Sequence, residues 1–257
     1  MRKGGKLIGF LLVMLCATMM VACGEQDTSK IEKAEIGDLY SNPDDYEGRT
    51  FDFTAQVFDV EKDSDGTYFQ CYYDIENYDK NTVVYTEDTD LNLKEDDFVR
   101  VEGSVEGEFS GENAFGGEVT APQVKATKVK KIAATEAFPA VKTVKVDKTI
   151  TKGSYKATVK KIDYTDSEMR IYLKVTNNSS SDFDNYPDQG SVIQNGKQHE
   201  VEYNDYYPQP SSELKAGASS ESVIVFKNVK KSDFRYEFSG YSDDYDEVNF
   251  SFDIKVK

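Results

Sequence analysis

The sequence YEGRTFDFTAQV at residues 46–57 decides the fold of the first part of the chain. Its apolar side chains recur at every second position from Phe51 to Val57, which is the period of a β-strand with one buried face. This phase slips at Val57 and Phe58, as it does at a bulge in a strongly bent strand. The turn sequence DSDG at residues 63–66 then predicts a hairpin. A bent strand that leads into a hairpin is the expected beginning of a small barrel.

Alternating apolar residues predict four more strands after this turn. A short helix at residues 34–40 is expected before the first strand. A polar crossover at residues 87–97 separates the third strand from the fourth, which Gly103 is expected to bend. A bent first strand, a hairpin, a crossover and a kinked fourth strand follow the order of a five-stranded OB-type barrel. The four later strands are predicted at residues 68–75, 82–86, 98–107 and 124–132.

Two stretches of this domain resemble a known family, residues 46–57 and the sequence KEDDFVRVEG at 94–103. They are similar to the OB-fold modules of bacterial exported proteins that are grouped as tRNA-anticodon-binding-like. The resemblance implies an OB-like domain at residues 34–132 and a nucleic-acid ligand. Residues 31–132, however, contain 25 acidic and 10 basic residues, a net charge of −15. Because such a surface repels phosphate backbones, we expect no nucleic-acid binding.

The N-terminus has the pattern of a secreted, lipid-anchored protein. Basic residues precede an uncharged apolar run at residues 7–21, which is too short to span a bilayer and is typical of a signal peptide. The sequence MVACG at 20–24 resembles the lipobox of bacterial lipoproteins. This resemblance implies a signal peptide at residues 1–22, a diacylglyceryl group on Cys23 and a tether at 23–33, on the extracellular face of the cell membrane. A signal peptide without lipidation is the alternative.

A second β domain is predicted at residues 141–257, after a linker at 133–140 that is rich in small residues and contains a proline. Apolar and polar residues alternate at 170–176 and again at 248–256, whereas no helical period is present. These features predict an antiparallel sandwich. The domain contains 19 acidic and 17 basic residues, so its net charge is only −2. The acidity of the chain therefore belongs to the first domain.

Two motifs of the second domain resemble the immunoglobulin-like domain of Gram-positive surface lipoproteins, a family of unknown function. They are VTNN at residues 175–178 and LKAG at 214–217. Together with the lipobox and the OB-type order, they make the chain similar to a bacterial surface lipoprotein of the Gram-positive type. The predicted fold class is all-β, with a five-stranded OB-like barrel followed by an antiparallel immunoglobulin-like β-sandwich.

The sequence contains no recognisable catalytic set. Cys71 shares the phase of Phe69 and Tyr73 on the predicted buried face, where a thiol behaves as a small hydrophobe. The single histidine, His199, is in the other domain, and no Gly-x-Ser-x-Gly sequence is present. We therefore expect no catalytic residues, no cofactor and no enzyme activity.

Two acidic segments raise calcium binding as an alternative. Glu61, Asp63 and Asp65 have the spacing of the first ligands of an EF-hand loop, but Tyr72 stands where the loop requires a glutamate. Four carboxylates also cluster at residues 243–247. We interpret both segments as solvated turns and expect no metal. A weaker calcium site, as in a calcium-assisted envelope enzyme, remains the alternative.

The outward side chains of the second strand are the candidate ligand-binding residues. Tyr68, Gln70 and Tyr72 lie on the sheet surface that OB folds use for ligands, and tyrosine is favoured at binding surfaces. Ordinary packing is the alternative for these three residues. Tyr203, Tyr206 and Tyr207 predict a second aromatic patch in the second domain. The favoured function is a non-enzymatic binding module for a basic protein or peptide. An inhibitor or immunity protein against a secreted basic hydrolase is the alternative.

Overall fold

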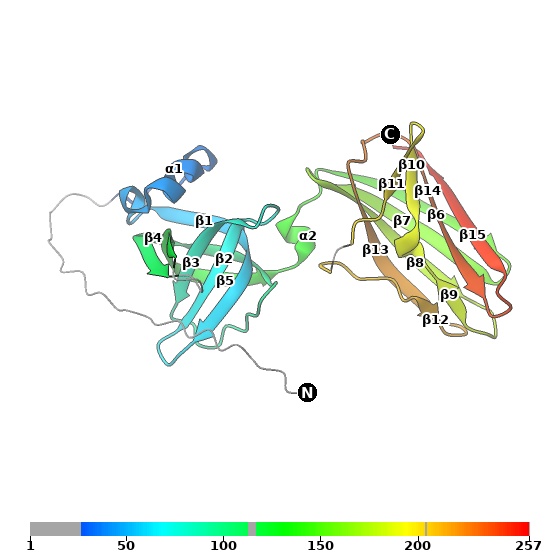
Figure 1. The fold of residues 1–257 in the computed structure, drawn as a ribbon, viewed down its shortest axis with the longest axis horizontal. Helices are drawn as coiled ribbons and strands as arrows, with labels where there is room; N and C mark the ends of the chain where they lie inside the picture. Colours follow the sequence, from blue (N-terminus) through cyan, green and yellow to red (C-terminus); the bar gives the residue numbers. More distant parts are fainter. Residues whose placement is uncertain (1–26, 113–116, 204, 257) are drawn as a thin grey trace. The chain divides into compact units, whose positions relative to one another are not determined.

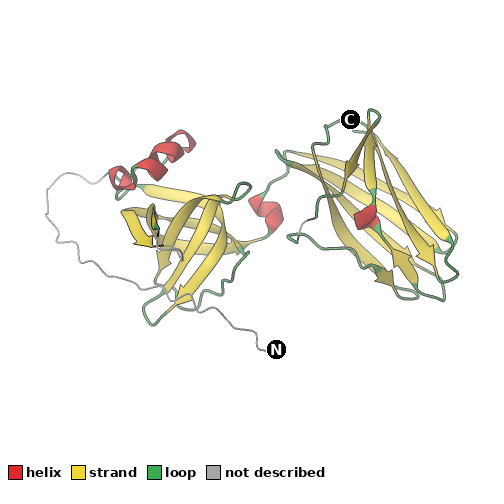
Figure 2. Ribbon diagram, viewed as in Figure 1, coloured by secondary structure: helices red, strands yellow, loops and turns green. Residues whose placement is uncertain are grey.

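The computed structural model describes residues 27–112, 117–203 and 205–256, and it consists mainly of β-strands (Figures 1 and 2). The chain divides into two compact units, and the division falls between Ala133 and Ala134. Each unit has its own hydrophobic core. In the described part of the chain, no helix is long and apolar enough to cross a membrane.

The first unit is a closed five-stranded barrel with the strand order β1-β2-β3-β5-β4. Neighbouring strands are antiparallel except for β3 and β5, which are parallel. This is the strand order of the OB fold, so the predicted barrel is confirmed. The strands are β1 (Thr50–Lys62), β2 (Thr67–Asp74), β3 (Asp79–Thr86), β4 (Phe98–Glu112) and β5 (Glu118–Ile132).

The predicted slip in β1 is the point where this strand changes neighbours. β1 pairs with β4 from Thr50 to Gln56 and with β2 from Gln56 to Lys62. The register shifts between Val57 and Asp59, which confirms the predicted bulge. Because a bulge bends a strand and increases its twist, the two halves of β1 can complete two different parts of the barrel wall.

Short helices precede the barrel and pack on its core (Figure 1). They are η1 (Lys33–Glu35), α1 (Ile36–Ser41) and η2 (Pro43–Tyr46). The predicted helix is therefore present, and α1 buries Ile36 and Leu39 against the inward residues of the strands. Proline at the start of η2 costs no backbone hydrogen bond, since the first turn of a helix leaves its N–H groups unpaired.

The predicted tether joins the barrel before residue 33. Ile31 is buried in the core of the first unit, and its N–H donates to the carbonyl oxygen of Thr50 at 2.9 Å. Lys30 forms a parallel bridge with the same residue. Ile31, which lies within the range predicted as a tether, therefore belongs to the core of the first unit.

The second unit is a sandwich of two antiparallel sheets, one of them with the order β13-β8-β7-β6. In the other sheet β14 lies between β10 and β15. In the first sheet β8 pairs with β13. Together, these neighbours of β8 and β14 form the predicted immunoglobulin-like arrangement. The larger strands are β6 (Lys142–Lys152), β7 (Tyr155–Tyr164), β8 (Glu168–Asn177), β13 (Ser219–Lys227), β14 (Phe234–Ser242) and β15 (Glu247–Ile254). The shorter elements are α2 (Ala134–Ala137), β9 (Phe183–Asn185), η3 (Pro187–Gln189), β10 (Ser191–Gln194), β11 (Lys197–Glu200) and β12 (Glu213–Leu214).

A buried ion pair lies on β8. The Nε atom of Arg170 is 2.5 Å from Oε1 of Glu168, and the two side chains are 1% and 8% exposed. Arg170 also donates from Nη2 to the carbonyl oxygen of Phe138 at 2.7 Å. Its guanidinium lies over the ring of Tyr207, whose hydroxyl donates to Glu168 Oε1 at 2.8 Å. This cluster attaches the end of the predicted linker to the second unit.

Candidate functional site

The three predicted binding residues lie on the outer side of β2. Tyr68, Gln70 and Tyr72 alternate with buried residues such as Cys71, so they point away from the core. Each of the three is half-buried. The amide of Asn81 on β3 donates from Nδ2 to Gln70 Oε1 at 3.0 Å and holds the glutamine side chain in place. The predicted phase is confirmed, and the binding role stays a prediction.

The strand registers place a defined set of side chains around these residues. β1 contributes an amide and two carboxylates on one side of β2. β3 contributes an amide, a valine and a tyrosine on the other side. We call this set the β1–β2–β3 face. Its members are Gln56, Asp59, Glu61, Tyr68, Gln70, Tyr72, Asn81, Val83 and Tyr85.

Aromatic rings cover both ends of the β1–β2–β3 face. Tyr68 packs on Tyr85 with ring centroids 4.6 Å apart. Tyr72 stacks on Phe58, at the bulge of β1, with centroids 4.2 Å apart, and meets the edge of Tyr78 at 5.9 Å. Rings that neighbours hold in place offer flat contact area at a low cost in side-chain entropy. The rings at both ends of the face can therefore contact flat or cationic groups of a ligand.

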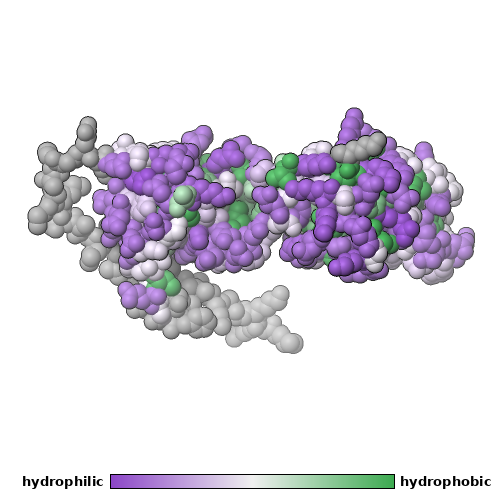
Figure 3. Space-filling view, turned by 90° about the horizontal axis from the view of Figure 1, so that it is seen from above, coloured by the Kyte–Doolittle hydropathy of each residue, from purple (hydrophilic) through white to green (hydrophobic). Residues whose placement is uncertain are grey.

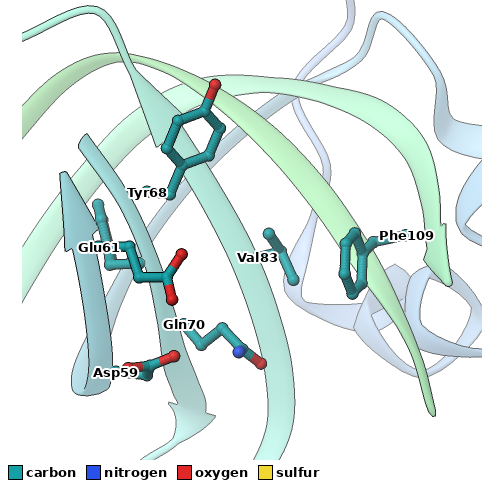
Figure 4. A pocket seen from close by; sticks show the side chains of 7 residues that line it. Asp59, Glu61, Tyr68, Gln70, Val83 and Phe109 are labelled. Carbon is teal, nitrogen blue, oxygen red and sulfur yellow. The ribbon is translucent and has the colours of Figure 1, made fainter. Parts of the chain in front are cut away.

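A small hollow opens between charged and apolar side chains of this face (Figure 4). Its volume is about 40 Å³, which is enough for a few water molecules or the end of one side chain. The carboxylates of Asp59 and Glu61 lie on one side, and Val83 and Phe109 lie on the other. The full lining consists of Asp59, Glu61, Tyr68, Phe69, Gln70, Val83 and Phe109. A lysine or arginine side chain, apolar along its stem and charged at its tip, matches this arrangement.

The local charge of the face is negative. Among the described residues, neither Asp59 nor Glu61 takes part in an ion pair. Burial raises the pKa of the Tyr68 hydroxyl, and the nearby Asp63 and Asp65 carboxylates raise it further. A cation that approaches this face therefore meets carboxylates with no cationic partner.

Cys71 and His199 belong to different units. Cys71 is fully buried inside the barrel, and its Sγ donates toward the carbonyl oxygen of Thr82 at 3.6 Å. Burial raises the pKa of this thiol, which makes it a poor nucleophile because the thiolate is the reactive form. His199 lies half-buried on β11 of the second unit.

The two acidic segments form hydrogen-bonded turns. Asp63 Oδ1 accepts from the N–H groups of Asp65 at 2.8 Å and Gly66 at 3.0 Å, as in an Asx turn. In the second segment the N–H of Asp246 donates to Ser242 Oγ at 3.1 Å. Within residues 27–112, 117–203 and 205–256, no group of three or more potential ligands is arranged to hold a metal ion.

The second aromatic patch predicted at residues 203–207 is wrong. Tyr203 is 79% exposed, whereas Tyr207 is 4% exposed because it closes the Arg170–Glu168 pair. A buried charge needs hydrogen-bonding partners, and this need overrides the tendency of neighbouring tyrosines to share one surface.

The sequence contained a signal for the carboxylates of the β1–β2–β3 face, and it was missed. After the slip at Phe58, Asp59 and Glu61 alternate with Val60, which packs on the core. Continuing the alternation past the bulge places both carboxylates on the outer face. Tyr85 was missed because its place beside Tyr68 depends on the register between β2 and β3.

Comparisons with known proteins leave the chain without a family. No family model matches it, and no curated protein matches it. A protein of unknown function from Listeria monocytogenes EGD-e has a similar structure, with a TM-score of 0.39 and 11% identity over 49% of this chain and 94% of that one. A conserved hypothetical protein from Bacillus anthracis gives a TM-score of 0.32 and 12% identity over 45% and 96%.

Proposed function

We propose that the chain is a lipid-anchored extracytoplasmic protein that binds a basic protein or peptide on the β1–β2–β3 face. The observation that carries the proposal is the position of two carboxylates, Asp59 and Glu61, without a cationic partner among the described residues and beside the Tyr68 ring. A lysine or arginine of the partner pairs with a carboxylate there and places its stem or its charge over a ring. The face supplies binding contacts and no reactive group.

The charge distribution of the sequence supports a basic partner for the first unit. Residues 31–132 have a net charge of −15, against −2 for residues 141–257. The face of each unit that Figure 3 shows is mostly hydrophilic, which suits a polar partner better than an apolar one. The electric field of this negative charge accelerates the approach of a cationic partner. It also makes the association sensitive to salt, because screening acts over about 10 Å at 0.1 M ionic strength.

The membrane anchor in this proposal depends on the sequence pattern around Cys23, which lies outside the described residues. Mass spectrometry of the mature protein is expected to find Cys23 as the first residue, carrying a diacylglyceryl group. Replacement by Cys23→Ala is expected to release the protein from membranes, since two acyl chains are what holds it there. A mature N-terminus without lipid contradicts the anchor and leaves the binding proposal unaffected.

The binding proposal is tested with the mature protein in detergent and a fluorescein-labelled octalysine peptide, with octaglutamate as the negative control. Fluorescence anisotropy is expected to show salt-sensitive binding of octalysine alone. The double variant Asp59→Asn/Glu61→Gln is expected to weaken it by about tenfold, from two ion pairs of up to about 1 kcal/mol each. The matched control, Asp243→Asn/Asp244→Asn, changes the net charge equally in the second unit and is expected to leave the affinity unchanged.

Two outcomes of this experiment contradict the proposal. Equal losses in the two double variants mean that octalysine responds to net charge and to no particular face. Binding of fluorescein-labelled single-stranded DNA to the protein, in the absence of octalysine, means that the acidic unit binds phosphates after all. A further variant, Tyr68→Leu, keeps most of the buried area but removes the aromatic ring, and it is expected to weaken binding at unchanged net charge.

A further inference from the structure

The second half of β1 has one paired edge and one open edge. Residues 59–62 pair with β2, whereas β4 ends its pairing with β1 at Gln56. The N–H of Val57 donates to Asp97 O, and the N–H of Asp96 donates to Val57 O, both at 2.9 Å. Beyond that point, no strand or loop in the described part of the chain pairs with the other edge of β1. The barrel wall therefore has a short open edge beside the β1–β2–β3 face.

The hairpin shows which backbone groups point to this open edge. The N–H of Asp63 donates to the carbonyl oxygen of Gly66 at 3.1 Å, so these residues form a hydrogen-bonded pair. Hydrogen-bonded and non-hydrogen-bonded pairs alternate along an antiparallel ladder, and the register is unbroken from residue 59 to residue 62. Asp59 and Glu61 therefore bond to β2. The N–H and C=O groups of Val60 and Lys62 point away from it.

The side chains along this edge specify a pattern for an added strand. Asp59 and Glu61 belong to the β1–β2–β3 face, and Val60 lies on the opposite side and packs on the core. Residues directly opposite one another on neighbouring strands share a face, where unlike charges attract. An added strand therefore fits with basic residues opposite Asp59 and Glu61 and an apolar residue opposite Val60. This pattern is basic–apolar–basic.

We propose that the basic partner contributes a segment with this basic–apolar–basic pattern, which binds as an extra antiparallel strand along residues 59–62 of β1. The proposal rests on the function proposed above and adds the mode of binding and the pattern recognised. In this mode the main chain supplies affinity and alternate side chains supply selectivity. The edge is short and follows a bulge, two features that keep strand edges from pairing without limit. It therefore suits one peptide and not another sheet.

The test compares three labelled peptides of identical charge on the mature protein by fluorescence anisotropy. The parent peptide alternates lysine and valine over nine residues. N-methylation of its valines removes the N–H groups that bond to Val60, since the two residues of a hydrogen-bonded pair exchange both bonds. Affinity is expected to fall by about tenfold or more. Methylation of the backbone nitrogens of its lysines alters only backbone N–H groups that point away from β1. It is expected to leave the affinity close to that of the parent.

A protein variant tests the same edge from the other side. Val60→Pro removes the outward N–H and keeps every charge of the face, and proline is tolerated where an edge N–H points to solvent. It is expected to weaken the parent peptide by about tenfold, with circular dichroism as the check on folding. If both N-methylated peptides bind like the parent, the added strand is wrong and the proposed function stands. If octalysine binds and the parent peptide does not, the basic–apolar–basic pattern is wrong and the proposed function stands; if neither peptide binds, the proposed function itself is wrong.

Discussion

The two units differ in what surrounds their charged side chains. In the second unit, two ion pairs on β7 and β8 contain buried charges that protein groups satisfy. Arg170 and Glu168 pair at 2.5 Å, and Lys161 pairs at 2.6 Å with Asp163, whose side chain is 6% exposed. Removing one partner of such a pair leaves a buried charge without compensation. These charges therefore maintain the fold.

The first unit keeps its ion pairs away from the β1–β2–β3 face. The guanidinium of Arg49 binds Glu35 beside α1, and Lys128 pairs with Glu102 across β4 and β5. On the face itself the carboxylates belong to no ion pair among the described residues. In the part of the chain that the structure describes, no cationic side chain loses an ion pair when these carboxylates are neutralised. The contrast separates charge that holds a fold together from charge that is free for a ligand.

The largest expected effect is in the second unit, where Arg170→Met removes one partner of the buried pair. Glu168 is then left buried without its cation, which is expected to lower the free energy of unfolding of this unit by about 3–5 kcal/mol. Urea unfolding followed by circular dichroism measures the loss. The exposed Arg235→Met on β14 is the matched control, and it is expected to cost about 1 kcal/mol or less.

A double variant separates the effect of the unpaired Glu168 charge from the effect of the lost arginine packing. Replacing both partners, Arg170→Met with Glu168→Leu, removes both charges together, and it is expected to recover much of the stability that the single variant loses. Should the single and double variants prove equally unstable, the volume of the arginine side chain matters more than its charge. The contrast between the units would then weaken.

The next effect is a pH dependence of the first unit to which its single thiol contributes. Burial raises the pKa of Cys71 above its ordinary value of 9.0. Above that pH the unfolded chain loses the thiol proton while the folded chain keeps it, so stability falls as pH rises. Between pH 9 and 10 this loss is expected to approach about 1.4 kcal/mol per pH unit. Urea unfolding at a series of pH values measures the slope.

The variant Cys71→Ala is expected to be less stable at pH 7 and to lose the part of this slope that the thiol contributes, while tyrosines such as Tyr40 and Tyr73 keep the rest. The second unit has no cysteine, but burial raises the pKa of its Tyr164, Tyr207 and Tyr236 hydroxyls, so its own transition shows the slope that tyrosines alone produce. An unchanged slope in Cys71→Ala assigns the pH dependence to tyrosines such as Tyr40, whose pKa burial also raises.

The sequence predicted the barrel because its evidence is local. The alternation in residues 51–57, the slip at Phe58 and the hairpin turn each depend on a few neighbouring residues, and all three are present. Strand ends were less predictable. β4 ends at Glu112, whereas its predicted end was residue 107. β5 begins at Glu118, whereas its predicted start was residue 124. The extra residues form strands because β4 and β5 pair with each other. A polar and glycine-rich sequence does not predict this pairing.

The candidate site was predictable only in part, for the same reason. The phase of one strand suffices to place Tyr68, Gln70 and Tyr72 on an outer surface. Pairing between strands is needed to bring Tyr85 beside Tyr68 and to leave residues 59–62 with an open edge. Tyr207 shows the limit most clearly, since its burial depends on Arg170 and Glu168, 37 and 39 positions earlier in the chain.

The smallest expected effect completes the comparison. Asp59→Asn/Glu61→Gln, which is expected to weaken peptide binding, is expected to change the free energy of unfolding of the first unit by no more than about 0.5 kcal/mol. The reason is that neither carboxylate has a cationic partner to lose in the described part of the chain, while removing two negative charges relieves repulsion with Asp63 and Asp65. Urea unfolding of this variant beside the wild-type protein measures the difference. A loss as large as that of Arg170→Met would show that these carboxylates also hold the fold, and the distinction between the two units would fail.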